Sequence, residues 1–314
     1  MSADSNSLVR LSPVSHHAGI SVISPASFAM PERVQLGLER LTQLGYAPQL
    51  GGNAQNRGPL FFSGPPEERI ADLHAAFVDP ETSMVVAIRG GYGSNYLLDR
   101  IDLELIKRNP KPFFAYSDMT GLQLHLLDEL GLPVFHGPMV AADFYLEDGV
   151  HLESFRAAIE GRPYAVGAVE GLRTLKAGEA SGTLYGGCLS IMVAMIGTRW
   201  EPDTEGNLLF LEDVGAKPYQ IDRMLWHLRT AGKLNGVRGI IFGEMLDCSS
   251  PGAPDGLLED AILSALAGLD VPIAFGLRSG HVSRQNVTLT FGVEAVLQAG
   301  DEAQLHLLEP AVRS

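Results

Sequence analysis

Residues 111–127 read KPFFAYSDMTGLQLHLL, which predicts a short aromatic strand that passes directly into a helix at Ser117. At such a strand-to-helix turn, a serine side chain stands clear of the edge of the sheet. The backbone N–H groups that follow are unpaired at the start of the helix and point toward negative charge. This geometry suits a nucleophile in acyl transfer. A simple helix cap, made by Ser117 or Asp118, is the more common role for these residue types at such a junction.

The same alternation of strands and helices continues on the N-terminal side of this stretch. Continuous apolar runs predict strands at 20–23, 84–88 and 113–116. Apolar residues at helical spacing predict helices at 31–44, 66–77 and 97–107. Strands without polar alternation that are separated by helices are typical of a parallel sheet covered on both faces. We therefore predict an α/β domain with a parallel sheet.

The pattern changes after Gly161-Arg162-Pro163, where short segments punctuated by glycine replace the alternation, and residues 172–178 resemble a hairpin or a loop-rich link. We place a domain boundary there, so that residues 1–163 carry the candidate nucleophile and residues 164–314 form a second α/β domain. In the second domain the apolar runs predict strands at 208–211, 239–242, 287–290 and 303–308, and helices at 218–231 and 257–267.

The bulk composition argues against several classes of partner. The chain has 314 residues, of which 46% are hydrophobic, and a formal net charge of -14. An acidic chain without a Lys/Arg-rich run is repelled by nucleic-acid phosphates and by anionic lipid, so we expect neither as a partner. No apolar segment has the length of a signal peptide or a membrane span, which predicts a cytoplasmic protein. Cys188 and Cys248 lack metal-ligand spacing and are expected to be ordinary buried residues.

Polar side chains at Ser117, Glu212 and His281 follow predicted strands or their loops. A serine hydroxyl needs an imidazole to take its proton and a carboxylate to fix the imidazole tautomer, and these three residues supply that set in an order that triads allow. Taken singly, Glu212 with Asp213 also suits an acidic pair at a helix N-terminus. His281 also suits a loop histidine bonded to the backbone.

A glycine-rich stretch, RGGYGS at 89–94, follows one predicted strand and precedes a helix. The dinucleotide fingerprint needs a third glycine where Tyr96 stands, and no Walker lysine follows, so nucleotide binding is disfavoured. The glycines let backbone N–H groups approach a ligand closely. The stretch therefore suits either an oxyanion hole or a purely structural turn.

Six motifs in sequence order resemble the LD-carboxypeptidase family, which comprises the muramoyltetrapeptide carboxypeptidases and their microcin C immunity relatives. The motifs are RGGYG (89–93), YSDMT (116–120), HGP (136–138), LEDV (211–214), PYQIDRML (218–225), and GH (280–281) together with NVTL (286–289). The resemblance extends from about Ile20 to Leu297. It implies a Rossmann-like or flavodoxin-like N-terminal domain joined to a smaller C-terminal α/β domain.

The resemblance also implies an activity and a set of site residues. The expected enzyme is a cytoplasmic serine peptidase that removes terminal D-alanine from murein tetrapeptide during cell-wall recycling, without a metal or organic cofactor. Its nucleophile, general base and orienting carboxylate would be Ser117, His281 and Glu212. The backbone amides of Gly91 and Asp118 would form the oxyanion hole. By the same resemblance we expect a homodimer.

Arg89, Tyr92 and Cys188 are the residues expected to contact substrate. The guanidinium fork of Arg89 suits a carboxylate, although an ion pair that stabilises the fold would use it equally well. The chain departs from the family pattern at three positions: Ala115 replaces a usual glycine, Cys188 a usual asparagine and Ala216 a common acidic residue. The methyl group of Ala115 would tighten the turn before Ser117. Loss of a buried amide removes a specific hydrogen-bond partner, so the changes at Cys188 and Ala216 bear on substrate detail more than on catalysis.

Two alternative functions remain. The same chemistry would serve an immunity-type enzyme that hydrolyses an acyl-sulfamoyl or aminoacyl-nucleotide adduct, although the segment PYQIDR at 218–223 favours the peptidase. A protein of another class would bind peptides on this fold without catalysis, with its triad misaligned. The changes at Ala115 and Cys188 are the support for that interpretation.

Overall fold

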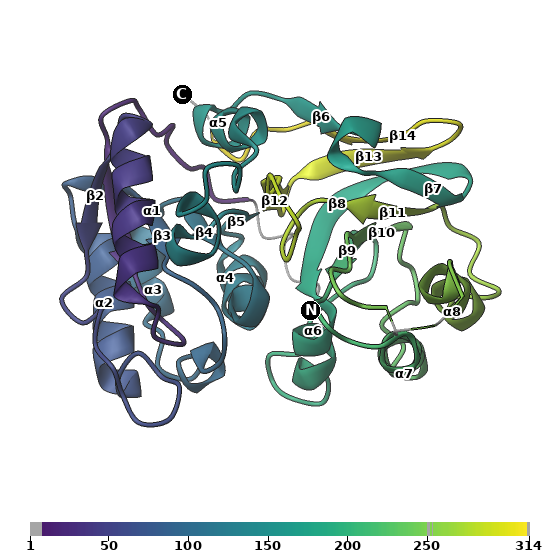
Figure 1. The fold of residues 1–314 in the computed structure, drawn as a ribbon, viewed down its shortest axis with the longest axis horizontal. Helices are drawn as coiled ribbons and strands as arrows, with labels where there is room; N and C mark the ends of the chain where they lie inside the picture. The colour runs from purple at the N-terminus through teal and green to yellow at the C-terminus, as the bar shows by residue number, and fades with distance from the viewer. Residues whose placement is uncertain (1–7, 250–251, 253, 313–314) are drawn as a thin grey trace, which may run out of the picture. The chain divides into compact units, whose positions relative to one another are not determined.

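The computed structural model describes residues 8–249, 252 and 254–312, and the chain forms two compact units (Figure 1). The first unit contains residues 1–162, 284–292 and 310–314, and the second contains residues 163–283 and 293–309. We call residues 284–292 the return segment.

The first unit is built on a six-stranded sheet. In spatial order the strands are β2 (Ala47–Leu50), β1 (Gly19–Ile23), β3 (Thr82–Ala87), β4 (Phe113–Ala115), β5 (Val134–His136) and β12 (Leu289–Phe291). Strands β1 to β5 are parallel and β12 is antiparallel to β5. The order 2-1-3-4-5 is the flavodoxin-like one, with its switch point between β1 and β3. The predicted parallel α/β sheet is confirmed.

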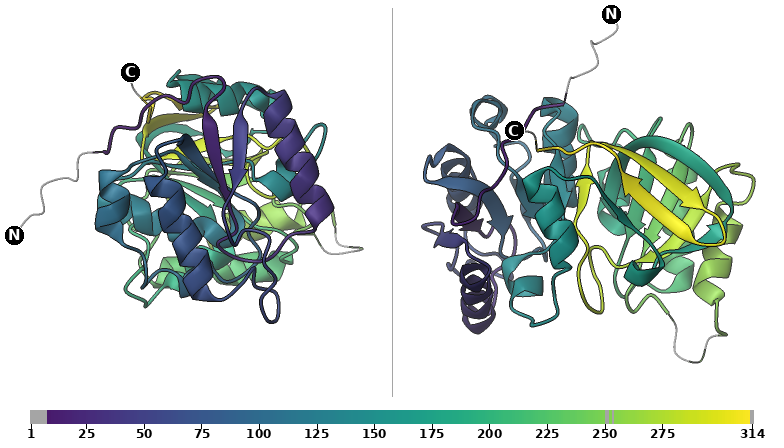
Figure 2. Two further views of the ribbon diagram at one scale, coloured as in Figure 1. Left: turned by 90° about the vertical axis from the view of Figure 1, so that its left-hand side faces the viewer. Right: turned by 90° about the horizontal axis from the view of Figure 1, so that it is seen from above.

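Helices accompany this sheet in the order that the sequence predicts. They are α1 (Pro31–Gln43), α2 (Pro66–Val78), η1 (Ser94–Tyr96), α3 (Leu103–Arg108), η2 (Ser117–Met119), α4 (Thr120–Leu130), η3 (Val140–Phe144) and α5 (Leu152–Glu160). α1 and α2 begin with proline and carry acidic residues in the first turn, both of which favour a helix start. α1, α2, α4 and α5 each contact strands of the sheet, and Figure 2 shows α1 beside β1 and β2.

Two predicted elements of this unit differ from the structure. The helix predicted at 97–107 is shorter, because Asp102 caps α3 by accepting a hydrogen bond from the Leu105 N–H at 2.9 Å. The strand predicted at 287–290 in the second domain is β12, which pairs with β5 in the first unit. Such pairing depends on a strand far away in the sequence, so the local pattern does not reveal it.

The second unit is built on an eight-stranded sheet. In spatial order the strands are β6 (Tyr164–Val166), β14 (Ala303–Leu307), β13 (Glu294–Ala299), β8 (Gly178–Cys188), β9 (Leu208–Glu212), β10 (Gly239–Gly243), β11 (Ile273–Leu277) and β7 (Arg173–Lys176). The four strands from β8 to β11 are parallel, and the others are antiparallel to their neighbours. The helical segments are η4 (Ala168–Glu170), α6 (Leu189–Met195), α7 (Pro218–Thr230) and α8 (Leu257–Ala265).

The sheet of the second unit curls strongly. Ala177 alone joins β7, at one edge, to β8 in the interior of the sheet. A flat sheet would separate these two strands by several strand spacings of about 4.8 Å each, which one residue cannot span. Consistent with the curl, Gly178 at the start of β8 lies against Pro272, immediately before β11.

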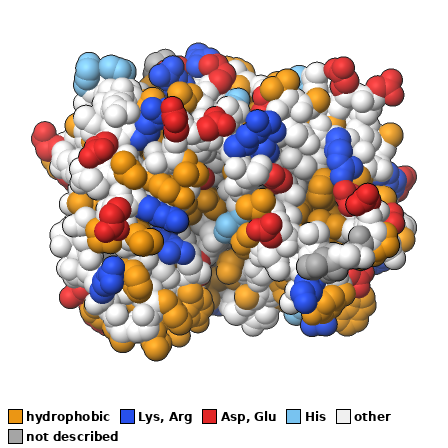
Figure 3. Space-filling model, viewed as in Figure 1, with side chains coloured by type: hydrophobic (Ala, Val, Ile, Leu, Met, Phe, Trp, Pro, Cys, Tyr) orange, Lys and Arg blue, Asp and Glu red, His pale blue; other side chains and the backbone are white. Residues whose placement is uncertain are grey.

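The face drawn in Figure 3 has a mixed surface chemistry. On the face drawn in Figure 3, basic side chains are scattered among acidic and hydrophobic ones. Within the part of the chain that the structure describes, no helix is both long and apolar enough to cross a membrane.

Candidate active site

Ser117 is the first residue of η2 and lies in a strained turn two residues after the end of β4. Its φ is 68°, in the left-handed region, whereas Tyr116 before it is extended with φ -160° and ψ -170°. A non-glycine residue in this region is strained, and such strain concentrates at functional sites. Within the described residues, neither η2 nor α4 has a side-chain cap hydrogen bond, so neither Ser117 nor Asp118 serves as the simple cap considered above. We call residues 116–118 the Ser117 turn.

The glycine loop, residues 89–94, lies directly against the Ser117 turn. A Cβ added to Gly90 would lie 2.8 Å from the Ser117 Cβ, 3.0 Å from its Oγ and 3.2 Å from the Asp118 nitrogen. Gly91 has a φ of 105°, and a Cβ there would lie 2.5 Å from the Ser27 Oγ. Gly90 is therefore required for the close approach of the loop to Ser117, and Gly91 for its close approach to Ser27.

Asp118 holds the glycine loop in place. The Ser94 N–H donates to its Oδ2 at 2.8 Å, and the Ser94 hydroxyl donates to its backbone carbonyl at 2.7 Å. Burial raises the pKa of the Asp118 carboxyl, while the hydrogen bonds from Ser94 and from the Gly93 backbone oppose this shift. The side chain that follows the serine thus fastens the loop after β3 to the turn after β4.

Arg69 supports the same loop and was not singled out from the sequence. Only 2% of this arginine is exposed, and its Nη1 donates to the carbonyls of Pro25 at 2.6 Å and Gly93 at 2.7 Å. Its Nε donates to the Gly64 carbonyl at 3.1 Å, and burial lowers the pKa of the guanidinium. Arg69 joins the loops after β1 and β3, so the frame around Ser117 is tightly hydrogen-bonded.

Arg89 and Tyr92 extend from the glycine loop into solvent. Arg89 is exposed, and among the described residues no carboxylate forms an ion pair with it. The Tyr92 N–H donates to the Ser27 Oγ at 3.0 Å. The residue is 41% exposed, and the centroid of its ring lies 5.3 Å from that of the Phe61 ring. Both side chains are available to a ligand at the carboxyl edge of the sheet.

In the second unit, His281 and Glu212 form a hydrogen-bonded pair. The His281 Nδ1 lies 2.7 Å from the Glu212 Oε2, and the His281 backbone N–H donates to the same oxygen at 3.1 Å. The glutamate side chain is 0% exposed and the histidine side chain 21%. A buried carboxylate on Nδ1 fixes the imidazole tautomer and leaves Nε2 as the proton acceptor.

Neighbouring strands make room for this pair. Glu212 ends β9, and a Cβ added to Gly243 at the end of β10 would lie 2.6 Å from the Glu212 Cβ. The loop that carries His281 is held by Glu244, whose Oε2 accepts the Ser283 N–H at 2.9 Å. The sequence did not point to Glu244, since nothing in its neighbourhood marks it as a loop anchor.

Asp213 and Cys188 adjoin Glu212 without sharing its contact to the histidine. Asp213 accepts the Ser190 N–H, near the start of α6, at 2.8 Å, and burial raises the pKa of its carboxyl. The helix N-terminal role considered for the acidic pair therefore belongs to Asp213. Cys188 is the register partner of Glu212, and burial, with the nearby charges of Glu212 and Asp213, raises the pKa of its thiol well above the usual value. A neutral thiol is a poor nucleophile.

Both cysteines are buried, as predicted. Burial raises the pKa of the Cys248 thiol to about 11. Within the described residues, no group of three or more His, Cys, Asp or Glu side chains is arranged to hold a metal ion.

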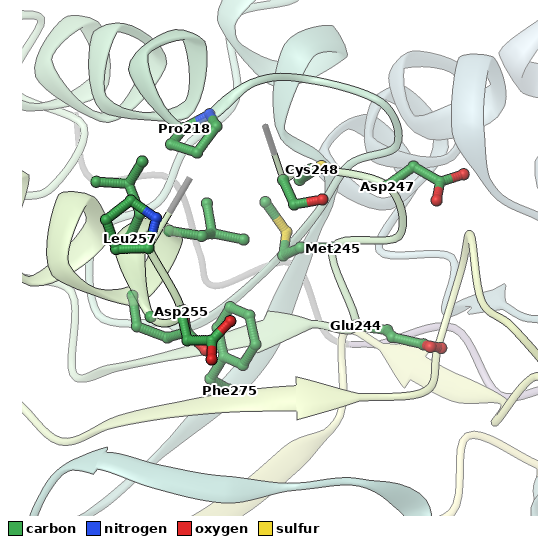
Figure 4. Close-up of a pocket in the computed structure, with 13 residues that line it drawn as sticks. Pro218, Glu244, Met245, Asp247, Cys248, Asp255, Leu257 and Phe275 are labelled. Carbon is green, nitrogen blue, oxygen red and sulfur yellow. The ribbon is translucent and has the colours of Figure 1, made fainter. Parts of the chain in front are cut away.

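An open pocket of about 420 Å³ lies at the carboxyl ends of β10 and β11 in the second unit (Figure 4). The described residues that line it include Pro218, Met245, Cys248 and Phe275, together with acidic residues such as Glu244. Glu212 and His281 are not among the residues that line it. None of the residues predicted to act in the site lines this pocket. The pocket is linked to the site through Glu244, which lines it and also holds the loop that carries His281.

The predicted site residues divide between the units. The first unit holds Ser117, Asp118, Arg89, Gly91 and Tyr92, and the second holds Glu212, His281 and Cys188.

Comparisons with known proteins agree on one family. Models of the LD-carboxypeptidase N-terminal and C-terminal domains match residues 20–137 and 181–297. The probable murein peptide carboxypeptidase of Bacillus subtilis (strain 168) is 35% identical over 292 residues, which cover 90% of this chain and 89% of that protein. The muramoyltetrapeptide carboxypeptidase from Oxalobacter formigenes has a crystal structure with a TM-score of 0.83 and 27% identity, covering 93% of this chain and 99% of that one. The microcin C7 self-immunity protein MccF, in complex with aspartyl sulfamoyl adenosine, has a TM-score of 0.89 at 22% identity over 97% and 100% of the chains.

Proposed function

Because the chain belongs to the LD-carboxypeptidase family, we propose that it is a serine carboxypeptidase that removes the terminal D-alanine of murein tetrapeptide in cell-wall recycling. One observation carries the proposal: the buried Glu212 carboxylate lies 2.7 Å from the His281 Nδ1, the arrangement of a histidine base with its orienting partner. The names of the Bacillus subtilis and Oxalobacter formigenes relatives support murein peptide as the substrate class.

The proposed mechanism uses Ser117, His281 and Glu212 as a triad. The His281 Nε2 removes the Ser117 proton, and the Ser117 Oγ attacks the carbonyl carbon that precedes the terminal D-alanine. Collapse of the tetrahedral intermediate breaks the C–N bond, and the imidazolium gives its proton to the leaving nitrogen. Water, deprotonated by His281, then attacks the acyl-enzyme and releases the shortened peptide.

The oxyanion of this mechanism would accept hydrogen bonds from the backbone N–H groups of Gly91 and Asp118. The close fit of the glycine loop on the Ser117 turn, set by Gly90, supports this assignment. By precedent, one such donor is worth roughly 100- to 1000-fold in rate. No step of this mechanism is assigned to a metal or an organic cofactor.

Arg89, Tyr92 and Cys188 are proposed to bind the substrate. The exposed guanidinium of Arg89 would pair with the terminal carboxylate through its two parallel N–H groups. Tyr92 would offer ring surface beside it, and Cys188 would shape the site next to Glu212 by packing. We also propose that the protein is a homodimer located in the cytoplasm, and the support for both statements is the family resemblance.

A second candidate function is the hydrolysis of acyl-sulfamoyl or aminoacyl-nucleotide adducts. The TM-score of 0.89 to MccF favours it, although at 22% identity that likeness concerns the fold alone. A non-catalytic peptide-binding protein is the alternative of another class.

The test is release of free D-alanine from purified murein tetrapeptide, with a peptide ending in L-alanine as the control substrate. We expect the wild type to release D-alanine only, and Ser117→Ala to release none.

Glu212→Gln should lower kcat by roughly 100- to 10,000-fold, because the orienting charge on the imidazole is lost. The Asp213 carboxylate accepts a hydrogen bond from α6 and does not contact His281, so Asp213→Asn should keep most of the wild-type kcat.

The outcomes separate the candidates. If a folded wild type releases no D-alanine but hydrolyses an aspartyl sulfamoyl adenosine, the second function replaces the first. If it binds tetrapeptide without cleaving either compound, the protein is a binding protein. Release that persists in Ser117→Ala would refute the serine mechanism.

A further inference from the structure

Asp143 is a buried carboxylate that the proposed mechanism does not use. It lies in η3, after the turn that follows β5, and only 4% of its surface is exposed. Removal of an ionised carboxylate from water is unfavourable unless hydrogen-bond donors replace the water. The donors around Asp143 therefore indicate what this side chain holds in place.

Donors from three separate parts of the first unit meet at the Asp143 carboxylate. The Met139 N–H donates to Oδ2 at 2.8 Å, and the Asn286 Nδ2–H donates to Oδ1 at 3.1 Å. The Tyr116 hydroxyl lies 3.4 Å from the same Oδ1, which is a longer and weaker contact. One side chain thus joins the turn after β5, the residue before Ser117 and the return segment.

The contact to Tyr116 bears on the nucleophile. Tyr116 is the last extended residue before the strained Ser117, and only 5% of it is exposed. Its ring lies 5.8 Å from the ring of His136 at the end of β5, measured between centroids. Because the ring contacts His136 and its hydroxyl contacts Asp143, the backbone that orients Ser117 has little freedom to rotate.

The contact to Asn286 bears on the base. Asn286 is 0% exposed, its N–H donates to the Gly149 carbonyl at 2.8 Å, and its own carbonyl accepts the His151 N–H at 3.1 Å. The return segment begins a few residues after His281, and Asn286 is where it becomes fixed in the first unit. This anchor therefore limits the freedom of the loop that carries the imidazole.

We propose that Asp143 is a positioning residue, which acts on the nucleophile through Tyr116 and on the base through Asn286. It touches neither substrate nor the reacting atoms. The inference rests on the proposed function, because it takes Ser117 and His281 as the groups that must be positioned. Productive geometry is sensitive to such support, since a misplacement of about 1 Å is enough to cost roughly 100-fold in rate.

The first test compares Asp143→Asn with a matched control, Asp72→Asn. Asp72 is also a buried carboxylate of the first unit, 6% exposed, and it accepts hydrogen bonds at 2.9 Å from the backbone and side-chain nitrogens of Asn53. We expect Asp143→Asn to lower kcat by roughly 10- to 100-fold with KM within about twofold of wild type. Asp72→Asn should lower the melting temperature comparably and leave kcat unchanged.

The double variant Asp143→Asn with Asn286→Ala should lower kcat no more than the more damaging of the two single variants, because the Asn286 side chain acts through its contact with Asp143.

The inference is overturned if Asp143→Asn, per folded molecule, has the wild-type kcat, or if Asp72→Asn loses kcat equally. Additive losses in the double variant would likewise refute the route through Asn286.

A second measurement does not depend on activity, so it separates this inference from the proposed function. Amide hydrogen exchange in residues 285–288 and 117–119 should become at least about tenfold faster in Asp143→Asn, but not in Asp72→Asn. If the wild type releases no D-alanine, the proposed function fails, and the exchange result still decides whether Asp143 anchors these segments. Unchanged exchange would overturn the anchoring whatever happens to activity.

Discussion

Ser117 combines a reactive position with a backbone conformation that an L-residue adopts only under strain. Its φ of 68° places it where a side chain costs roughly 1–2 kcal/mol relative to the right-handed region. The sequence pattern of a strand followed by a helix was enough to predict a turn at this residue. The sign of φ was not predictable, because it depends on how the glycine loop packs against the turn.

This strain leads to a stability prediction at the residue scale. Ser117→Gly should have a larger free energy of unfolding than Ser117→Ala by about 0.5–1 kcal/mol, since glycine adopts the left-handed conformation freely and loses only part of this gain to chain entropy. Urea denaturation of both inactive variants measures the difference. Equal stability, or a more stable alanine variant, would contradict the strain at this position.

Residues that support the site differ in how visible they are in the sequence. Arg69 occupies the buried face of α2 at helical spacing from Leu73 and Ala76, and a charged residue at such an apolar position is a signal that could have been used. Asp143 gives no such signal. Its donors, among them Tyr116 and Asn286, are distant in the chain and meet only in the folded unit.

At the scale of elements, apolar runs predicted the buried parallel strands well, because strands covered on both faces need no polar alternation. The long β8 was not predicted, because its first residues, 178–182, lie in the stretch where the sequence predicts only short segments punctuated by glycine. Glycine has low strand propensity, and here it serves close packing: a Cβ at Gly186 would lie 1.9 Å from the Phe210 carbonyl oxygen.

The contact between the glycine loop and the Ser117 turn can be tested by adding one methyl group. Gly90→Ala would place a Cβ 2.8 Å from the Ser117 Cβ, so the two elements must separate. We expect kcat for D-alanine release to fall roughly 100-fold with the fold retained. Gly300→Ala is the control, because its Cβ would meet nothing within 4 Å. A Gly90→Ala enzyme with wild-type kcat would show that the loop does not constrain the serine.

The Asp118 contact between the same two elements predicts a pH dependence of stability. Burial raises the pKa of this carboxyl in the folded protein above its ordinary value of 3.8. As pH rises through the interval above 3.8, the unfolded state loses its proton first, so the folded state binds more protons and its stability falls. The Asp118→Asn variant has no such carboxyl and does not lose this stability. The free energy of unfolding of the variant minus that of the wild type should therefore rise between about pH 4 and pH 7. Urea denaturation at both pH values is the measurement, and a falling difference would contradict the shift.

At the scale of the whole molecule, the sequence predicted an α/β fold of two bodies, with a single passage of the chain from the first to the second. The later crossings were not predicted, because β12 is a three-residue strand whose assignment depends on its pairing with β5. Ser117 belongs to the first unit and the His281–Glu212 pair to the second.

The return segment predicts that the first unit is unstable without it. Leu289 and Phe291 are 0% exposed, and their burial contributes about 1.5–3 kcal/mol each. A fragment of residues 1–163 should unfold at lower urea concentration than the same fragment joined by a Gly/Ser linker to residues 284–292. The joined fragment with Leu289→Asp and Phe291→Asp is the control and should match the bare fragment. Equal midpoints for all three would contradict a stabilising role for β12.

The late position of β12 also has a consequence during synthesis. The ribosome adds β12 about 130 residues after the last helix of the first unit, which takes roughly 6 to 26 s at about 5–20 residues per second. Over that interval the nascent chain presents β5 as an open edge, and an unpaired edge invites pairing with other chains. Chaperones that cover exposed strand edges are thus expected to bind the nascent protein in this interval, and to release it once β12 has paired.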